Sequence, residues 1–249
     1  MKTNLIHCSY HKCLTKYYDK IMSVLYNRVS PFGEKYKHFK SNIDSFYSEC
    51  NDYRISSINN HNLDFHRLGD FRISRFIRDP RDLVVSGYFY HLRGAEKWCH
   101  IVSPDERDWI KVNGFIPVKM KTNDSFFSYL QNLNQEDGLI AEIDFRKHHF
   151  ESMLNWPVDD HRIKTFRYED LIGNEQDVFS KILSFYEVSW TERKIGAYLA
   201  NKFSASKNHG QPQHVRDPRP KQWETCFTPK VEEYFNERYL TLLERLEYV

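Results

Sequence analysis

Glycine and cysteine are both sparse in this chain. The position of the first glycine argues against a glycine-rich phosphate loop near the N-terminus, and the spacing of the cysteines argues against a disulfide framework. The 249 residues contain nine glycines, and the first of them is Gly33. The five cysteines are odd in number and form no Cys-x-x-Cys pair: Cys8, Cys13, Cys50, Cys99 and Cys226. Such scattered cysteines are typical of reduced thiols in a cytoplasmic protein and not of a disulfide framework.

Long apolar runs and an excess of one charge are also missing. No stretch approaches the roughly 18 apolar residues of a membrane span, and the N-terminus has no apolar leader, so we expect a cytoplasmic protein without a transmembrane segment. Lys and Arg total 36 against 34 acidic residues, which argues against general nucleic-acid binding. Local basic clusters that bind small anions remain compatible with this balance.

What the chain does have is an alternation of apolar strand patterns with helical ones. Strands are predicted at residues 4–9, 54–60, 72–77 and 162–168, and helices at 15–28, from Pro80 through Tyr88, at 174–187 and from Thr228 onward. This order predicts one α/β domain over residues 1–249, with a mainly parallel central sheet flanked by helices. Residues of about 93–160 break the rhythm, and we expect them to form an aromatic-rich helical insertion over the active face.

The first expected site is the turn at residues 9–16, where a strand runs into a helix. A helix N-terminus at the carboxyl end of a parallel strand attracts anions, and here Lys12 adds a charge and Thr15 a hydroxyl. An ATP-type loop is disfavoured because that loop needs glycines, which this turn lacks. A zinc site is disfavoured because His7 and Cys8 point to opposite faces of a strand. An ordinary turn with a solvated lysine remains the plain alternative.

A second basic turn follows at Arg78-Asp-Pro-Arg-Asp-Leu-Val-Val-Ser86. Arg78 ends a predicted strand and Ser86 lies two turns into the next helix, so both side chains can reach one phosphate. A charge-assisted hydrogen bond of this kind contributes about 1.5–3 kcal/mol. Two anion-binding turns at the ends of two strands indicate a ligand with two separate phosphate-type groups.

Three segments resemble the motifs of sulfotransferases that use 3′-phosphoadenosine 5′-phosphosulfate (PAPS). Residues 10–17 are similar to the 5′-phosphosulfate loop P-K-S/C-G-T-T-W, with Leu14 in place of its glycine and Lys16 in place of a threonine. Residues 78–86 resemble the 3′-phosphate motif R-[DN]-P-R-D-x-x-x-S. Residues 216–223, followed by Phe227 and Thr228, resemble R-K-G-x-x-G-D-W…F-T, with Lys221 in place of the second glycine.

The resemblance implies a P-loop-NTPase-like sulfotransferase fold and assigns roles to individual residues. Lys12 takes the place of the catalytic lysine, and His61 that of the base, with His66 and Glu96 as alternatives; no metal is implied. The residues implied to bind PAPS, or its product 3′-phosphoadenosine 5′-phosphate (PAP), are His11, Lys12, Cys13, Leu14, Thr15, Lys16, Tyr17, Arg78, Ser86, Tyr168, Phe203, Arg216, Asp217 and Pro218.

The activity that the resemblance implies is in-line transfer of a sulfuryl group from PAPS to a hydroxyl or amine. The acceptor is expected to be a carbohydrate, glycolipid or small metabolite. Aromatic residues such as Trp98, Trp109 and Phe126 either line its pocket or pack between helices. Two other functions remain open: a catalytically silent nucleotide-binding relative, which Leu14 and Lys16 favour, and a P-loop kinase.

Overall fold

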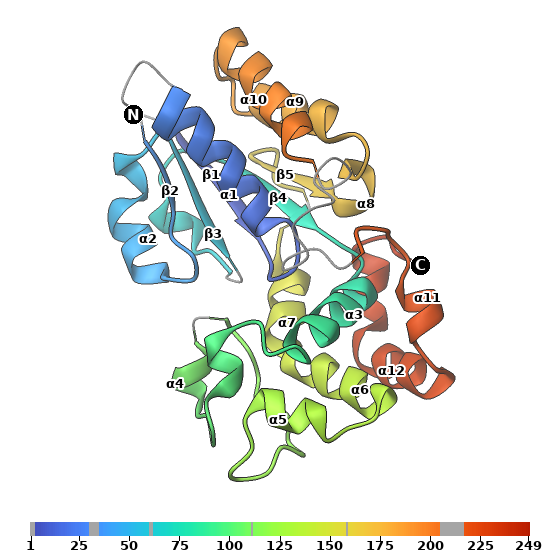
Figure 1. The fold of residues 1–249 in the computed structure, drawn as a ribbon. Coiled ribbons are helices and arrows are strands. Elements are labelled where there is room, and N and C mark those ends of the chain that lie inside the picture. The colour runs from blue at the N-terminus through green and yellow to red at the C-terminus, as the bar shows by residue number, and fades with distance from the viewer. Residues whose placement is uncertain (1–2, 30–34, 60–61, 111, 158, 205–216) are drawn as a thin grey trace. The chain divides into compact units, whose positions relative to one another are not determined.

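The described part of the chain forms two compact units in this computed structural model (Figure 1). The structure describes residues 3–29, 35–59, 62–110, 112–157, 159–204 and 217–249. Residues 1–77 and 157–219 make up the sheet unit, and residues 78–156 and 220–249 the helical unit. A single functional domain with an insertion at about 93–160 stays a prediction. None of the helices in the described ranges combines the length and apolar character needed to span a membrane.

The described residues of the sheet unit form one sheet of five parallel strands. They are β1 (Asn4–Ser9), β2 (Tyr36–His38), β3 (Ile55–Asn59), β4 (Phe71–Ile77) and β5 (Ile163–Arg167). Their order is β2-β3-β1-β4-β5, and every pairing is parallel. All six residues of the central strand β1 are buried, as expected for a parallel strand covered on both faces. The parallel sheet is thereby confirmed, whereas the three-residue β2 escaped prediction.

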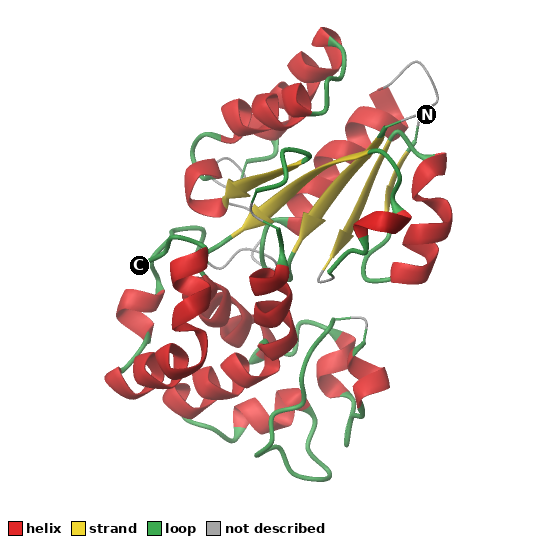
Figure 2. Cartoon of the chain, turned by 180° about the vertical axis from the view of Figure 1, so that it is seen from behind, coloured by secondary structure: helices red, strands yellow, loops and turns green. Residues whose placement is uncertain are grey.

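Helices flank this sheet, and α1 crosses one of its faces. The helix α1 lies in front of the strands in Figure 1 and behind them in Figure 2. The helical elements of the sheet unit are α1 (Thr15–Val24), η1 (Leu25–Val29), α2 (Ile43–Glu49), η2 (Cys50–Asp52), η3 (Phe65–Arg67), α8 (Tyr168–Leu171), α9 (Glu175–Phe185) and α10 (Trp190–Lys202). The α-helix predicted at 15–28 in fact ends at Val24 and continues as the π-helical η1.

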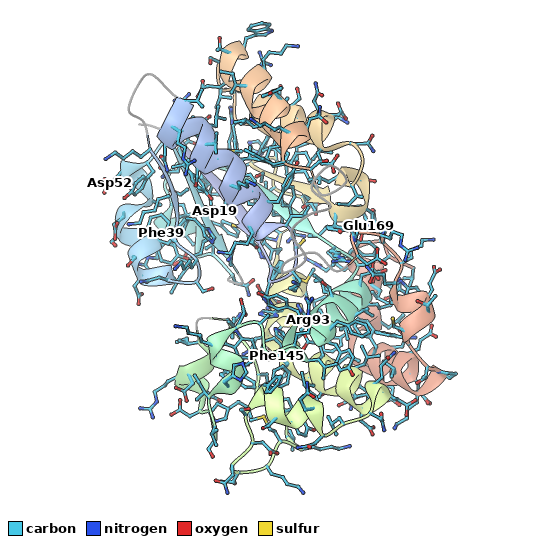
Figure 3. All side chains as sticks on the ribbon, in the orientation of Figure 1. Asp19, Phe39, Asp52, Arg93, Phe145 and Glu169 are labelled. Atoms are coloured by element: carbon cyan, nitrogen blue, oxygen red, sulfur yellow. The ribbon has the colours of Figure 1, made fainter. Side chains whose placement is uncertain are left out.

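The helical unit contains only helices and loops in its described residues. Its elements are α3 (Pro80–His91), η4 (Lys97–His100), α4 (Glu106–Trp109), α5 (Phe126–Gln131), α6 (Gln135–Phe145), α7 (Lys147–Asn155), α11 (Trp223–Cys226) and α12 (Pro229–Arg245). Trp98 stacks on Phe145 at 5.1 Å between ring centroids, and Trp109 and Phe126 are fully buried beside them (Figure 3 labels Phe145). These aromatic rings therefore pack between helices.

Charged residues also lie inside the helical unit, where they join α3 to α6. The Glu142 carboxylate is completely buried and contacts His91 Nδ1 at 2.7 Å and Arg146 Nε at 2.9 Å. A Cβ atom on Gly87 would lie 2.0 Å from Glu142 Oε1, so only glycine fits beside this carboxylate. Opposite charges in mutual contact reduce the cost of burying each of them.

In the sheet unit, a buried polar chain links β1, β4 and the residue that follows α9. His7 Nδ1 lies 2.7 Å from Ser74 Oγ, which lies 2.6 Å from the Tyr186 hydroxyl, and this hydroxyl donates to the Ile6 carbonyl. The imidazole of His7 stacks on Tyr18 at 3.6 Å between centroids. Burial holds the pKa of His7 well below its usual value, so this ring is neutral in the folded protein.

A core that keeps His7 neutral is expected to lose stability in acid. The unfolded chain takes up a proton at His7 near its ordinary pKa of about 6.5. The folded chain does not, so the free energy of unfolding falls as the pH drops below that value, by at most about 1.4 kcal/mol per pH unit. Urea unfolding at several pH values between neutral and mildly acidic measures this slope.

In His7→Gln the contribution of His7 to the slope is expected to disappear. His66→Gln is the matched control because His66 is an exposed histidine of the same unit, and it should leave the slope unchanged. A wild-type slope in His7→Gln would contradict the assignment.

Candidate functional site

The turn between β1 and α1 has an unusual backbone for a segment without glycine. Lys12 and Leu14 both adopt positive φ angles, of 71° and 60°. Between them Cys13 is completely buried, and its N–H donates to the Tyr10 carbonyl at 2.9 Å. Left-handed conformations are unfavourable for residues with a Cβ atom, so this turn stores strain that the buried Cys13 and its hydrogen bond counteract.

Hydroxyl groups tie the start of α1 to the carboxyl ends of two neighbouring strands. Ser9, the last residue of β1, has its Oγ 2.8 Å from Thr15 Oγ1 and donates to Asn59 Oδ1 at the end of β3. Thr15 Oγ1 also donates to the Tyr10 carbonyl at 3.3 Å. Leu14 occupies the N-cap position of α1, and no side chain of the described residues caps the helix there. This helix start therefore offers backbone N–H groups to an anion at the edge where parallel sheets bind ligands.

The other residues predicted in this loop differ in exposure and in packing. His11 and Lys12 are half-buried, and Lys16 is exposed. Tyr17 donates its hydroxyl proton to the Ala200 carbonyl at 2.6 Å and packs edge-on against Phe179. Tyr17 thus joins α1 to α9 and α10, and its predicted contact with adenine stays a prediction.

A second group of predicted residues lies at the end of β5 and after α10. The Tyr168 hydroxyl donates to the Pro218 carbonyl at 2.7 Å, so two predicted residues meet across fifty positions of sequence. The Asp217 carboxylate accepts hydrogen bonds from the guanidinium of Arg219. The half-buried ring of Phe203 lies 4.3 Å from Lys20 Nζ, a residue that sequence reasoning did not select.

The second basic motif, residues 78–86, forms the start of α3 in the helical unit. Asp79 is the N-cap and accepts the Arg81 backbone N–H at 2.9 Å, and Pro80 follows at the first helical position. Arg78 is 3% exposed, and its Nη2 lies 3.7 Å from Asp82 Oδ2. Burial raises the pKa of Asp82, while the Arg78 guanidinium opposes that rise. Ser86 lies half-buried further along the helix.

Two of the three candidate bases, His66 and Glu96, lie within the described residues. His61 and the predicted phosphate ligand Arg216 both lie outside the described residues. His66 is exposed on η3, and its backbone N–H donates to Asp64. Glu96 is half-buried just before η4 and accepts the indole N–H of Trp98 at 2.5 Å. The identity of the base stays a prediction.

Replacing Leu14 tests whether the first turn is strained. In Leu14→Gly the relief of about 1–2 kcal/mol of left-handed strain should exceed the roughly 0.5–1 kcal/mol by which glycine favours the unfolded chain. Leu14→Ala removes the same side chain but keeps the strain, so it is the matched control. Chemical denaturation should therefore show Leu14→Gly to be the more stable of the two variants. Equal stabilities would mean that the turn relaxes in solution.

Comparison with known proteins places the chain in a family. The family model described as "Sulfotransferase domain" matches residues 3–247. No curated protein sequence matches the chain significantly. Among solved structures, the chain is similar to mouse sulfotransferase SULT7A1 complexed with PAP, with 17% identity and a TM-score of 0.53 over 97% of this chain and 84% of that one.

Weaker similarity connects the chain to retinol dehydratase. The complex with androsterone and PAP has 12% identity and a TM-score of 0.47, over 96% of this chain and 80% of that one. The complex with retinol and PAP has 11% identity and a TM-score of 0.49, over 98% and 82%. Because the family model spans nearly the whole sequence, the chain belongs to the sulfotransferase domain family.

Proposed function

We propose that this chain transfers a sulfuryl group from PAPS to a hydroxyl or amine of a cytoplasmic acceptor. The observation that carries the proposal is the turn at residues 10–15, which contains Lys12. At its end, Thr15 and the uncapped start of α1 are joined through Ser9 to the carboxyl ends of β1 and β3. Membership in the sulfotransferase family supports PAPS as the donor, and so does the PAP with which the mouse sulfotransferase is complexed.

In sulfuryl transfer, the main tasks of the protein are to position the donor and the acceptor and to stabilise the charge that forms on the leaving group. PAPS supplies a sulfuryl group whose departure leaves negative charge on a phosphate oxygen. The ammonium of Lys12 and the N–H groups at the start of α1 are suited to that charge, and Thr15 adds a hydroxyl donor. Loss of one such preorganised donor typically lowers the rate by about 10²–10³.

Other residues are proposed to hold the nucleotide itself. Arg78 and Ser86 are assigned to the 3′-phosphate, and Tyr168 and Phe203 to the adenine side. Arg78 suits this role because a buried guanidinium gains more from a phosphate than an exposed one does. The segment at 216–223 is assigned to the 3′-phosphate end of the nucleotide. Asp217 and Pro218 lie in the described part of this segment.

The acceptor is proposed to be a carbohydrate, a glycolipid or a small metabolite with a free hydroxyl or amine. A base that takes up the acceptor's proton typically accelerates such a transfer by about 10²–10⁴. His61 is the first candidate, followed by His66 and Glu96. The scattered spacing of the five cysteines in the sequence supports a reducing compartment.

Nucleotide selectivity tests the proposed donor. Calorimetric titration of the purified protein should give saturable heat with PAP and none with ATP and Mg²⁺, since the first turn lacks the glycines of an ATP loop. Binding of ATP with Mg²⁺ but not of PAP would favour a kinase. Mass spectrometry of acceptors incubated with PAPS should then show the mass of one added SO₃ group. PAP binding without such transfer would indicate a silent relative.

Two substitutions should separate catalysis from nucleotide binding. Lys12→Ala is expected to lower kcat by about 10²–10³ with little change in PAP affinity, because this ammonium acts mainly on charge formed in the transition state. Arg78→Ala is expected to weaken PAP binding at least about tenfold, the loss of one charge-assisted contact.

Steady-state kinetics and PAP calorimetry measure both effects. Lys35→Ala, which changes an exposed lysine of the sheet unit, is the control. The assigned roles would be wrong if both site variants lost rate and affinity in parallel.

A further inference from the structure

Asp82 connects the first turn of α3 to a segment about 140 residues further along the chain. Its carboxylate is completely buried. Oδ2 accepts the backbone N–H of Lys221 at 2.7 Å, and Oδ1 accepts that of Trp223 at 3.0 Å. One side chain thus fixes two backbone positions of the segment at residues 220–223, which belongs to the same unit.

The same carboxylate also faces Arg78. Arg78 Nη2 lies 3.7 Å from Asp82 Oδ2, the oxygen that binds the Lys221 N–H. Both charged groups are almost inaccessible to solvent, with side-chain exposures of 4% and 0%. Opposite charges buried at this distance attract strongly, so the position of Asp82 restricts that of the guanidinium.

The backbone that Asp82 holds is itself strained. Lys221 has a φ of 64°, in the left-handed region, and it stands where the resembling motif has a glycine. A residue with a Cβ atom keeps this conformation only when its surroundings stabilise it. The hydrogen bond from Lys221 N–H to the buried carboxylate supplies that stabilisation.

Arg81 provides a second link across the same turn. Its guanidinium carbon lies 3.7 Å from the centre of the Trp223 ring. The guanidinium also bonds both carboxylate oxygens of Asp79, at 3.0 and 2.8 Å, and donates to the Tyr248 carbonyl at 2.9 Å. The segment is therefore fixed to α3 by its backbone through Asp82 and by an aromatic side chain through Arg81.

We infer that Asp82 is a positioning residue for nucleotide binding. Through Arg78 and through the backbone at 221–223, it sets two elements that the proposed function assigns to the 3′-phosphate end of PAPS, and the inference rests on that function. Its carboxylate, which accepts two backbone N–H groups and faces a guanidinium, holds both elements in place before the nucleotide binds. The conformational cost of forming the site is then met during folding and not during binding.

Asp82→Asn tests this role with little change in shape. The amide keeps one acceptor oxygen, presents an NH₂ group to the second backbone N–H, and removes the charge opposite Arg78. The Kd for PAP should rise about 10- to 100-fold, as expected for a lost charge-assisted bond of about 1.5–3 kcal/mol. KM for PAPS should rise with it, whereas kcat at saturating PAPS should stay within about twofold, because Asp82 is not assigned to the reacting atoms.

A second substitution distinguishes positioning from general stability. Lys221→Gly relieves the left-handed strain, so it should recover part of the PAP affinity when it is added to Asp82→Asn. Asp137→Asn, which changes a partly exposed carboxylate of the same unit that pairs with Lys230, is the control and should bind PAP as the wild type does. If Asp82→Asn does not fold, Asp82→Glu, which keeps the charge but displaces it, should show the same loss of affinity.

The inference is overturned if the folded variant melts at a lower temperature but binds PAP with unchanged Kd. Absence of PAP binding by the wild type would instead refute the proposed function, so the two failures are distinguishable.

Discussion

Left-handed backbone without glycine is the constraint on which two of the candidate binding segments depend. Leu14 in the sheet unit and Lys221 in the helical unit have φ angles of 60° and 64°. Each stands where the resembling sulfotransferase motifs carry glycine. A Cβ atom at such a φ costs about 1–2 kcal/mol, so each turn needs compensating contacts. The buried Cys13 and its bond to Tyr10 support the first turn, and the Asp82 carboxylate supports the second.

Buried polar groups are stabilised in two ways in this protein. At His7 in the sheet unit, the ring is kept neutral and its Nδ1 lies 2.7 Å from the Ser74 hydroxyl, so no charge is buried at that position. In the helical unit, charges are buried in contact with opposite charges, as Glu142 is with Arg146 and Asp82 is with Arg78. Removal of one member of such a pair leaves the other uncompensated, so these positions tolerate few substitutions.

Much of the fold followed from local pattern. The strand at 4–9 has the predicted bounds, and Pro80 opens α3 as expected because its missing N–H has no partner in a first helical turn. The predicted helix at 15–28 was wrong in its last turn, where the chain becomes π-helical from Leu25. Short elements such as β2 were missed because three residues carry too little periodicity to identify a strand.

The sequence by itself determined the chemistry of the two basic turns, because residue types and their spacing fix which groups can bind an anion. It also determined the alternation of strands and helices that gives a parallel sheet. Only the tertiary structure decided that Tyr17 packs against α9 and α10, that Tyr168 bonds Pro218 within the sheet unit, and that Asp82 bonds Lys221 within the helical unit. Such contacts join residues far apart in the chain, and neither periodicity nor motif spacing encodes which of them meet after folding.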